Sequence, residues 1–504
     1  MPTHSHHHNS YHGHHHSSHH KHHKSSRRRS RFADLKIVNA MLLLLYAVLA
    51  GLATYMMYAH HILAFRHLNV VYSIILVAIF ALCLTLSILK KSRVLTTVLL
   101  VVFSIIAAAS LFAFKSLVDV AHNMNETASY SEIEMSVVVP SNSSVNDVSD
   151  LTSVQAPTDA DGSNINELLS HIKSEKGVDL ATEKVDSYQA AYENLINGSS
   201  QAMVFNSAYS SLLEMSYENY QSNLKTIYSY KIKTSIKDEA KAHDSNVFNI
   251  YISGIDTYGS ISTVSRSDVN LILTVNMNTH KILMTETPRD AYVKIPDGGA
   301  DQYDKLTHAG IYGVETSEKT LENLYGITID YYARLNFDSF LKLIDALGGV
   351  TVYNSQAFTS LHGNYDFPVG NVTLDSDKAL GFVRERYSLE HGDYDRGNNQ
   401  MKVIQAILNK MTSLKSVSNY STIISNVQDS IQTDMKLDTV MKLVNGQLDS
   451  GEKFTVTSQE VTGTGSTGEL TSYAMPSSSL YMIKLDDASV AKASQAIKDV
   501  MEGK

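Results

Sequence analysis

The chain has very little cysteine: Cys83 is the one thiol in 504 residues. Because Cys83 falls in an apolar stretch that we expect to cross a membrane, the rest of the chain can form no internal disulfide. The sequence is therefore unlike a secreted domain held together by disulfides, and it fits an exported protein that folds without oxidative help. Its length exceeds one ordinary domain, so we expect a membrane part plus two or three folded units.

Acidic residues are almost missing from the first part of the chain. Residues 1–115 hold 12 Lys and Arg but one acidic residue, Asp34, which leaves 30 basic against 50 acidic residues, a net charge of −20, for residues 116–504. An acidic part of this kind lacks the clustered positive charge that phosphate contacts need. We therefore do not expect nucleic acid as a partner, and any anion must be met by a local cluster of cations.

Apolar periodicity is absent from residues 1–35, where the tail HSHHHNSYHGHHHSSHHKHHKSSRRRSR holds 12 of the 22 histidines. Such a segment cannot bury a core, so we predict a disordered cytoplasmic tail. Clustered imidazoles can hold a transition metal, but a solvated tail is the simpler interpretation. We interpret the arginines from Arg27 to Arg31 as anchoring charges, with contact to DNA or anionic lipid as the alternative.

Three uncharged apolar stretches follow, each long enough to cross a bilayer as a helix. Within residues 36–115 they are Ile37 to Phe65, His67 to Leu89 and Val94 to Phe114. Basic residues precede the first stretch and separate the second from the third. The positive-inside bias then predicts a multi-pass cell-membrane protein with a cytoplasmic N-terminus and an extracellular remainder. Three full-length spans also argue against a cleaved signal peptide.

Two regions of the predicted extracellular part carry no recognisable chemistry. Residues 116–245 alternate helical patterns with short β-rich runs such as EMSVVVP and QAMVFN, which indicates a small α/β accessory domain. We interpret it as a spacer or interaction domain, with half of a solute-binding module as the alternative. Residues 416–504 are predicted to complete the extracellular part with helices, a segment rich in Gly, Ser and Thr, and a terminal helix.

Candidate chemistry begins at residue 246, where charged residues recur at successive strand ends. FNIYISGID runs into Asp256, SRSDVNLILTVN places Arg266 and Asp268 just ahead of a second strand, and KILMTETPRDAYV delivers Arg289 where a third strand ends. Arg266 and Asp268 are two residues apart in an extended chain, so they point to the same face. The recurrence predicts a site at one edge of a sheet.

A second cluster of cations lies in FVRERYSLEHGDYDRGNNQMKVIQAIL, residues 382–408. Arg384 and Arg386 come at the end of one predicted helix. Arg396 begins the next, an amphipathic helix on which Gln400 follows one turn later on the same face. An anion at this entrance would meet guanidinium groups, free backbone N–H groups and the positive end of the helix dipole.

These motifs together resemble a known family. The order GID, SRSD, TPRD, KLTHAG, DALGGV, RER and D-x-x-R-x-x-N-Q resembles the LytR-CpsA-Psr (LCP) family of Gram-positive cell-wall enzymes over residues 246–415. The three spans and the accessory module resemble its streptococcal capsule (CpsA-type) branch. The resemblance implies an α/β fold class, with an LCP-type α/β sandwich as the catalytic domain after the membrane helices and the accessory domain.

The resemblance also implies an activity. It is that of a phosphotransferase, or ligase, that moves capsular or another anionic glycopolymer from an undecaprenyl pyrophosphate carrier to peptidoglycan, with Mg²⁺ as cofactor. The implied partners are the carrier-linked polysaccharide, the peptidoglycan acceptor, the cell membrane and the capsule-synthesis machinery. The residue types agree, because a pyrophosphate diester reacts only when its charge is neutralised.

Individual residues receive roles by the same resemblance. Asp256 and Asp268 fall on the family's metal-side aspartates, and one or two carboxylates are enough for Mg²⁺ when phosphate oxygens and water complete its shell. Asp393 is a candidate general base or an orienting residue, and Arg266 and Arg289 are the other expected catalytic residues. The expected pyrophosphate contacts are Arg266, Arg289, Arg384, Arg386, Arg396 and Gln400.

Some positions leave alternatives open. Asn399 stands where many members of the family have arginine, so the pyrophosphate would be held by one cation fewer. His308 in KLTHAG is expected to pack or form a hydrogen bond, with acceptor contact or proton transfer as the alternative. The apolar strands Phe248 to Ile255 and Leu271 to Val275 are expected either to admit a polyprenyl chain or to form a dry core.

Two other functions compete with the ligase. The first is a membrane-bound regulator, whose outer domains sense lipid-linked sugar while the basic tail contacts DNA or a kinase. The second is a pyrophosphatase that uses water as acceptor on the same arginine scaffold. Deleting residues 1–31 separates the regulator from the ligase, because glycopolymer attachment by a ligase depends on the outer domains.

Overall fold

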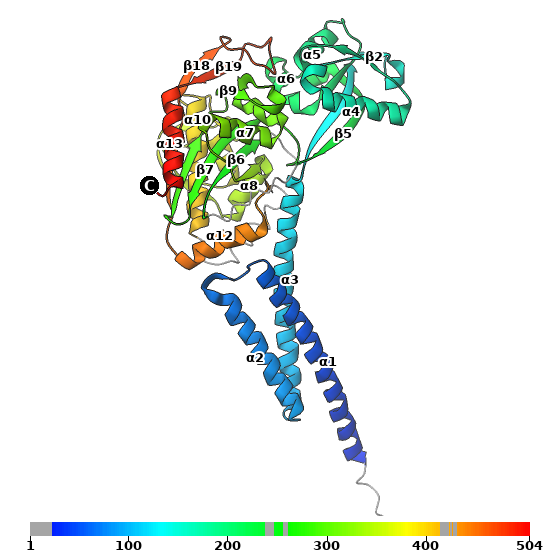
Figure 1. The fold of residues 1–504 in the computed structure, drawn as a ribbon, viewed down its shortest axis with the longest axis vertical. Helices are drawn as coiled ribbons and strands as arrows, with labels where there is room; N and C mark the ends of the chain where they lie inside the picture. The colour runs from blue at the N-terminus through cyan, green and yellow to red at the C-terminus, as the bar shows by residue number, and fades with distance from the viewer. Residues whose placement is uncertain (1–22, 237–245, 256–260, 414–422, 424–425, 427–430) are drawn as a thin grey trace, which may run out of the picture. The chain divides into compact units, whose positions relative to one another are not determined.

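A computed structural model describes residues 23–236, 246–255, 261–413, 423, 426 and 431–504 (Figure 1). The chain divides into two compact units. Unit 1 comprises residues 1–62 and 67–115, and unit 2 comprises residues 63–66 and 116–504. The fold class is mixed α/β, as predicted, with apolar helices near the N-terminus and sheets in unit 2.

Among the described residues, three helices are long and apolar enough to cross a membrane. They are α1 (His23–Ala59), α2 (Leu68–Ile88) and α3 (Arg93–Ala128). Tyr46 of α1 is fully buried and donates a hydrogen bond to the carbonyl of Leu76 on α2 at 2.9 Å. Cys83 is buried on α2, inside the second candidate span, where the sequence placed it.

The helix ends differ from the prediction. Helix α1 begins at His23, inside the tail predicted to be disordered over residues 1–35, and residues 1–22 of that tail lie outside the described residues. Arginine and alanine favour helix, so the segment RRRSRFADLK extends the first span backwards. Helix α3 continues past the predicted Phe114 to Ala128, because Leu117 and Val120 keep one side of it buried.

The accessory region of unit 2 is built on a five-stranded sheet in the order β3-β2-β4-β1-β5. Its strands are β1 (Tyr130–Pro140), β2 (Ser153–Ala156), β3 (Ala181–Lys184), β4 (Met203–Asn206) and β5 (Leu224–Ser235). The central β1 buries Val137 and Val139 on one face and Val138 on the other, which explains its continuous apolar run. Helices α4 (Thr158–Lys176), α5 (Tyr188–Ile196) and α6 (Ser210–Ser216) complete the region.

The second region of unit 2, which the sequence predicts to be the catalytic domain and which is called the catalytic region below, is built on a six-stranded sheet in the order β16-β11-β6-β7-β8-β17. Its strands are β6 (Val247–Ile255), β7 (Ser267–Asn276), β8 (Lys281–Glu286), β11 (Tyr331–Leu335), β16 (Ile431–Thr433) and β17 (Thr455–Glu460). β7 is antiparallel to β6 and β8, whereas β11 and β17 run parallel to their neighbours β6 and β8. The start of β7 and the end of β8 therefore meet at one sheet edge.

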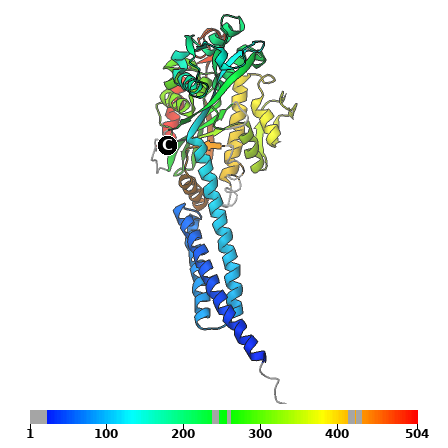
Figure 2. The same cartoon turned by 90° about the vertical axis from the view of Figure 1, so that its right-hand side faces the viewer.

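Helices cover both faces of this sheet. The covering helices are α7 (Val314–Tyr325) and α13 (Asp487–Met501) on one face, and α10 (Asp393–Thr412) and α12 (Leu437–Ser450) on the other. Residue alternation decides the face: Ile272 packs toward α7 and α13, and Leu271 and Leu273 pack toward α10. Figure 2 shows α10, in yellow, standing beside the green strands of the sheet.

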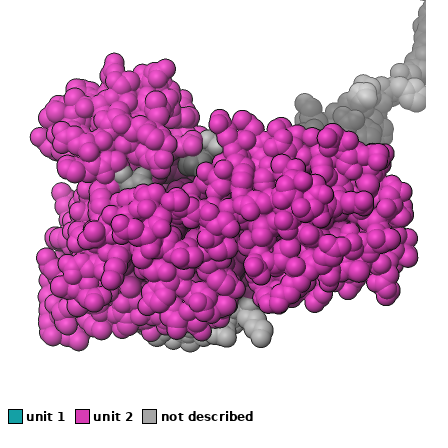
Figure 3. Space-filling view, turned by 90° about the horizontal axis from the view of Figure 1, so that it is seen from above, with its two compact units in different colours: residues 1–62, 67–115 teal, residues 63–66, 116–504 magenta. Residues whose placement is uncertain are grey.

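Smaller elements surround the sheet of the catalytic region. They are β9 (Tyr292–Ile295), β10 (Gln302–Lys305), the 3-10 helix η6 (Leu306–Tyr312), α8 (Phe337–Ala346), β12 (Val350–Asn354), β13 (Phe358–Thr359), β14 (Asp366–Phe367), β15 (Gly370–Leu374), α9 (Ser376–Arg384), β18 (Gly463–Thr467) and β19 (Tyr481–Leu485). The accessory and catalytic regions share one apolar core, in which Tyr209 and Leu212 pack with Ile311 and Met482. Figure 3 shows the surface of unit 2, with a smaller lobe beside a larger body.

Candidate active site

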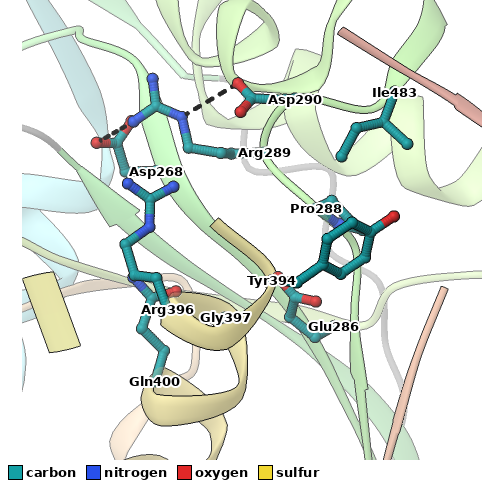
Figure 4. Close-up of a pocket in the computed structure, with 10 residues that line it drawn as sticks. All are labelled: Asp268, Glu286, Pro288, Arg289, Asp290, Tyr394, Arg396, Gly397, Gln400 and Ile483. Carbon is teal, nitrogen blue, oxygen red and sulfur yellow. Dashed lines mark ion pairs between the residues drawn. The ribbon is translucent and has the colours of Figure 1, made fainter. Parts of the chain in front are cut away.

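A small pocket, partly open to solvent, lies where the start of β7, the end of β8 and the first turns of α10 converge (Figure 4). Strand β19 adds one apolar side chain to its wall. The lining residues are Asp268, Glu286, Pro288, Arg289, Asp290, Tyr394, Arg396, Gly397, Gln400 and Ile483. Four of the residues proposed from the sequence, Asp268, Arg289, Arg396 and Gln400, therefore come together here.

Asp268 and Arg289 form the ion pair at the centre of the pocket. The distance from Arg289 Nη1 to Asp268 Oδ2 is 2.6 Å, and Asp268 Oδ1 accepts a hydrogen bond from Thr307 Oγ1 at 3.1 Å. Burial opposes ionisation of Asp268, but the guanidiniums of Arg289, Arg266 and Arg396 outweigh it and hold the pKa of this carboxyl below its usual value. Asp268 is therefore an anion inside a cationic wall.

A second carboxylate supports Arg289 from behind. Asp290 Oδ1 lies 3.5 Å from Arg289 Nε and 2.6 Å from Nζ of the buried Lys305. Burial lowers the pKa of Lys305, although Asp290 acts in the opposite direction. With its head tied to Asp268 and Asp290, the Arg289 side chain is fixed before any ligand arrives, which reduces the entropy lost on binding.

Arg266 lies behind the pocket and does not line it. Its side chain is buried and its Nη1 lies 2.8 Å from Sδ of Met215, a residue of α6 in the accessory region. The backbone ahead of it is held by Arg334, whose Nη2 donates to the carbonyl of Thr263 at 2.9 Å. Arg266 acts on the site electrostatically, because its positive charge lowers the pKa of Asp268 and helps to keep this carboxyl ionised.

The first turns of α10 supply the rest of the cationic wall. In Figure 4 the guanidinium of Arg396 points toward Arg289 and Asp268, and Gln400 follows one turn below it. Gln400 Nε2 also donates to the carbonyl of Val383 on α9 at 3.2 Å, which ties the two helices together. The positive end of the dipole of this 20-residue helix adds to the positive potential of the pocket.

Arg384 and Arg386 do not line this pocket. Arg384 ends α9 and is exposed, while Arg386 donates from Nη2 to the hydroxyl of Tyr387 at 2.6 Å and stacks on its ring at 4.5 Å. Glu385, which lies between them, is buried and organises the turn. Its carboxylate accepts hydrogen bonds from the backbone N–H groups of Leu361, Arg386, Tyr387 and Ser388.

The structure describes only part of the predicted metal site. Asp256 lies outside the described residues, and Asp393 begins α10, but its side chain is not described either. Among the residues that were described, no three His, Cys, Asp or Glu side chains gather as a metal site. Asp268 fits Mg²⁺ as a carboxylate ligand, provided that phosphate oxygens and water supply the rest of the shell.

His308 has a structural environment. It is fully buried on η6, and its Nδ1 lies 2.9 Å from Oδ1 of Asp304. Asp304 also accepts hydrogen bonds from Ser472 Oγ at 2.7 Å and from the N–H of Ala474 at 2.8 Å. This network joins η6 to the C-terminal segment and lies away from the pocket lining, so the hydrogen-bonding interpretation of His308 holds.

Glu286 was missed by sequence reasoning, although it lines the pocket. It is 9% exposed, and burial together with the neighbouring Glu460 raises its pKa to about 8, while Arg396 acts in the opposite direction. The sequence did contain a signal for it. In KILMTE, alternate residues point to the same face of the strand, so the carboxylate of Glu286 follows the apolar Ile282 and Met284 on the face that they bury. Tyr394, which lies beside it, had no such signal.

The chemistry open to this pocket is that of anion recognition. Two guanidiniums, an amide and a helix N-terminus face one cavity, and an ionised carboxylate stands among them. Guanidiniums bind phosphate oxygens in pairs of parallel hydrogen bonds, and helix N-termini favour the same ligand. The site therefore fits a phosphate or pyrophosphate group.

Comparison with known proteins assigns the family. The protein-family model described as "LytR_cpsA_psr family" matches residues 203–488, which is more than half of the chain. A second model, described as DNA polymerase processivity factor, matches residues 90–205, which include most of α3; it covers less than half of the chain and assigns nothing. The chain belongs to the LytR-CpsA-Psr family.

Curated relatives carry the name polyisoprenyl-teichoic acid–peptidoglycan teichoic acid transferase TagU. The protein from Oceanobacillus iheyensis is 36% identical over 231 residues, covering 44% of this chain and 69% of the relative. The one from Enterococcus faecalis is 32% identical over 277 residues, covering 54% and 86%. The crystal structure of Bacillus subtilis TagU is similar with 27% identity and a TM-score of 0.40, covering 52% of this chain and 99% of that one.

Proposed function

We propose that this protein is a membrane-anchored phosphotransferase that moves an anionic glycopolymer, such as capsular polysaccharide, from an undecaprenyl pyrophosphate carrier to peptidoglycan on the outer face of the membrane. The observation that carries the proposal is the pocket in which Arg289 and Arg396 surround Asp268 at the N-terminus of α10. The relatives support the same class, because their names describe transfer of teichoic acid from a polyisoprenyl carrier to peptidoglycan.

Arg289, Arg396 and Gln400 bind the pyrophosphate in this proposal. Arg289 lines the pocket and is held in place by Asp268 and Asp290. The guanidiniums neutralise the charge of the phosphate oxygens, which makes phosphorus accessible to an incoming hydroxyl and stabilises the charge that develops on the leaving polyprenyl phosphate.

A buried apolar layer lies next to this head-group site. Met401 directly follows Gln400 on α10, and with Ile404 and Leu408 it packs against the sheet residues Leu271 and Leu273. We propose that the polyprenyl chain of a carrier whose pyrophosphate lies on the arginines enters this layer, which requires these packed side chains to separate. Each CH₂ group of the chain that is buried there would contribute roughly 0.8 kcal/mol to binding.

Magnesium fits the same arrangement. Asp268 would hold the ion, together with Asp256 as the resemblance implies and with oxygens of the pyrophosphate. When bound, it would supply further neutralisation of the phosphate charge. The protein side of the reaction is then binding, orientation and charge stabilisation by Asp268, Arg289 and Arg396.

The proposal is tested with the full chain in lipid vesicles, supplied with Mg²⁺, a lipid-pyrophosphate-linked saccharide and peptidoglycan fragments. Mass spectrometry should find the saccharide joined to the acceptor through phosphate. The product should disappear in Arg289→Ala but persist in the control Lys294→Ala, an exposed lysine that pairs with the exposed Asp301 at 3.7 Å.

The other outcomes are informative. Tight binding of the carrier with no joined product would contradict the transferase and favour a sensor of lipid-linked sugar. Release of free saccharide phosphate would favour a pyrophosphatase. Attachment that continues at the parental rate in Arg289→Ala would remove this pocket from the mechanism.

A further inference from the structure

The walls of the pocket differ in chemistry. In Figure 4 the guanidinium of Arg396 turns toward Arg289 and Asp268, whereas Glu286 lies on the other side of the first turn of α10, beside Tyr394. One wall thus carries the cations that suit a pyrophosphate. The other carries a carboxyl group and an aromatic ring, which suit a sugar hydroxyl and the face of a sugar ring.

The carboxyl of Glu286 is held in the pocket by packing alone. Its side chain is 9% exposed, and a Cβ placed on Gly397 would lie 3.0 Å from Glu286 Oε1, so the carboxyl sits directly against the helix backbone. Within the described part of the chain, no side-chain hydrogen bond or ion pair of this carboxyl is present. A buried polar group normally has such a partner, and one without it has free capacity for a ligand.

A second glutamate adjoins it by the sheet register. Glu460 of β17 pairs with Glu286 of β8 in the parallel ladder, so the two side chains lie on the same face of the sheet. Two neighbouring carboxylates resist full ionisation, and one of them then becomes a strong proton acceptor. Gln459, one residue earlier, faces the opposite side, where its Nε2 bonds to Thr285 Oγ1 at 2.8 Å.

We propose that Glu286 is the general base of the transfer reaction, with Tyr394 as the neighbouring platform for the acceptor sugar. This assignment rests on the proposed function and deepens it. The acceptor hydroxyl oxygen attacks the phosphorus that carries the glycopolymer, a new P–O bond forms, and the hydroxyl proton passes to the carboxylate of Glu286. The bond between the two phosphates breaks, its electron pair leaves with the polyprenyl phosphate, and Glu286 then releases the proton to solvent.

The charged surroundings set the pH range in which Glu286 works. Burial and Glu460 raise its pKa to about 8 and Arg396 opposes them, so the base form increases as the pH rises through that value. A base with a pKa near the working pH is the most effective. The titratable and charged groups around Glu286 are Glu460 on β17, Tyr394 and Arg396 on α10, Tyr325 on α7, and Asp268, Arg289 and Asp290 across the pocket.

The test measures transfer by the full chain in vesicles as a function of pH, alongside binding of a fluorescent lipid pyrophosphate. For Glu286→Gln we expect transfer to fall by roughly 10²- to 10⁴-fold with carrier binding within about two-fold of wild type. Glu460→Gln should keep transfer and move the rising limb of its pH profile to lower pH, because the neighbouring negative charge is gone. The exposed Glu469 provides the matched control, Glu469→Gln, which should retain the wild-type profile.

Each contrary result has a definite meaning. The assignment of Glu286 is overturned if Glu286→Gln transfers at the wild-type rate, or if it loses carrier binding and transfer in parallel. Either result leaves the proposed function standing. A pH profile that Glu460→Gln does not shift also overturns the assignment, even where Glu286→Gln fails to fold. Absence of transfer by the wild-type chain overturns the proposed function, and this assignment with it.

Discussion

The buried carboxyl of Glu286 makes the stability of unit 2 depend on pH in a defined direction. Its pKa lies at about 8 in the folded chain, above the ordinary 4.5 that applies when the chain is unfolded. Between these values the folded state binds more protons than the unfolded state, so stability falls as the pH rises. Replacing Glu286 by Gln, which stays neutral at every pH, should remove this loss.

The size of the effect follows from the two pKa values. Each unit of difference corresponds to about 1.4 kcal/mol, so the contribution lost between about pH 5 and pH 7 is roughly 2–3 kcal/mol. Because the entropy of unfolding is about 2.1 cal/mol/K per residue and unit 2 comprises residues 63–66 and 116–504, this corresponds to roughly 3 °C in the midpoint of thermal unfolding. Between about pH 5 and pH 7, the stability of Glu286→Gln relative to that of wild type should therefore rise by this amount.

The assay is thermal unfolding of both full-length chains in the same detergent, at about pH 5, 6 and 7. The difference between the variants isolates Glu286, because all other groups titrate in both chains. The exposed control Glu469→Gln should follow wild type at each pH. A constant difference between Glu286→Gln and wild type across the series would refute the reasoning, since it would mean that Glu286 ionises alike in the folded and unfolded chains.

Three further results are expected. Gly310→Ala should destabilise the chain by about 1–3 kcal/mol in thermal unfolding, because a Cβ there would lie 2.6 Å from backbone atoms of Ser265 and Ser267, whereas Gly162→Ala, with open space around it, should not. Arg289→Ala should weaken binding of a fluorescent lipid pyrophosphate by roughly 10- to 100-fold in titrations, the usual cost of a lost charged hydrogen bond; unchanged affinity would exclude Arg289 from the head-group site. Removing Mg²⁺ with a chelator should stop transfer reversibly, and transfer that persists in chelator would contradict a role for the metal.

Much of the fold could be predicted because local patterns agreed with it. The three apolar stretches became the three candidate spans, and the alternating runs at Val247 and Ser267 became the antiparallel strands β6 and β7. Gly326, at φ +61°, ends α7, which agrees with the preference of helix ends for glycine in the left-handed conformation. The start of α1 at His23 was not predicted, because composition shows that a segment buries no core but not whether a neighbouring helix extends into it.

The candidate site was predictable only where its residues lie next to a sheet edge or a helix start. Asp268, Arg289 and Arg396 meet because β7, β8 and α10 converge at one edge. The sequence could not show that Arg266 turns toward Met215, since that contact joins regions about 50 residues apart. Nor could it single out Glu286, whose environment depends on a strand, β17, that comes far later in the chain.

The most direct test of the central claim uses a carrier whose saccharide-bearing phosphorus is labelled with an isotope. The full chain in vesicles is supplied with this carrier, Mg²⁺ and peptidoglycan fragments, and the label is followed by mass spectrometry. The account predicts that the label enters peptidoglycan with the saccharide while unlabelled polyprenyl phosphate is released in equal amount. Label that leaves as free saccharide phosphate, or that remains on bound carrier, would contradict a phosphotransferase.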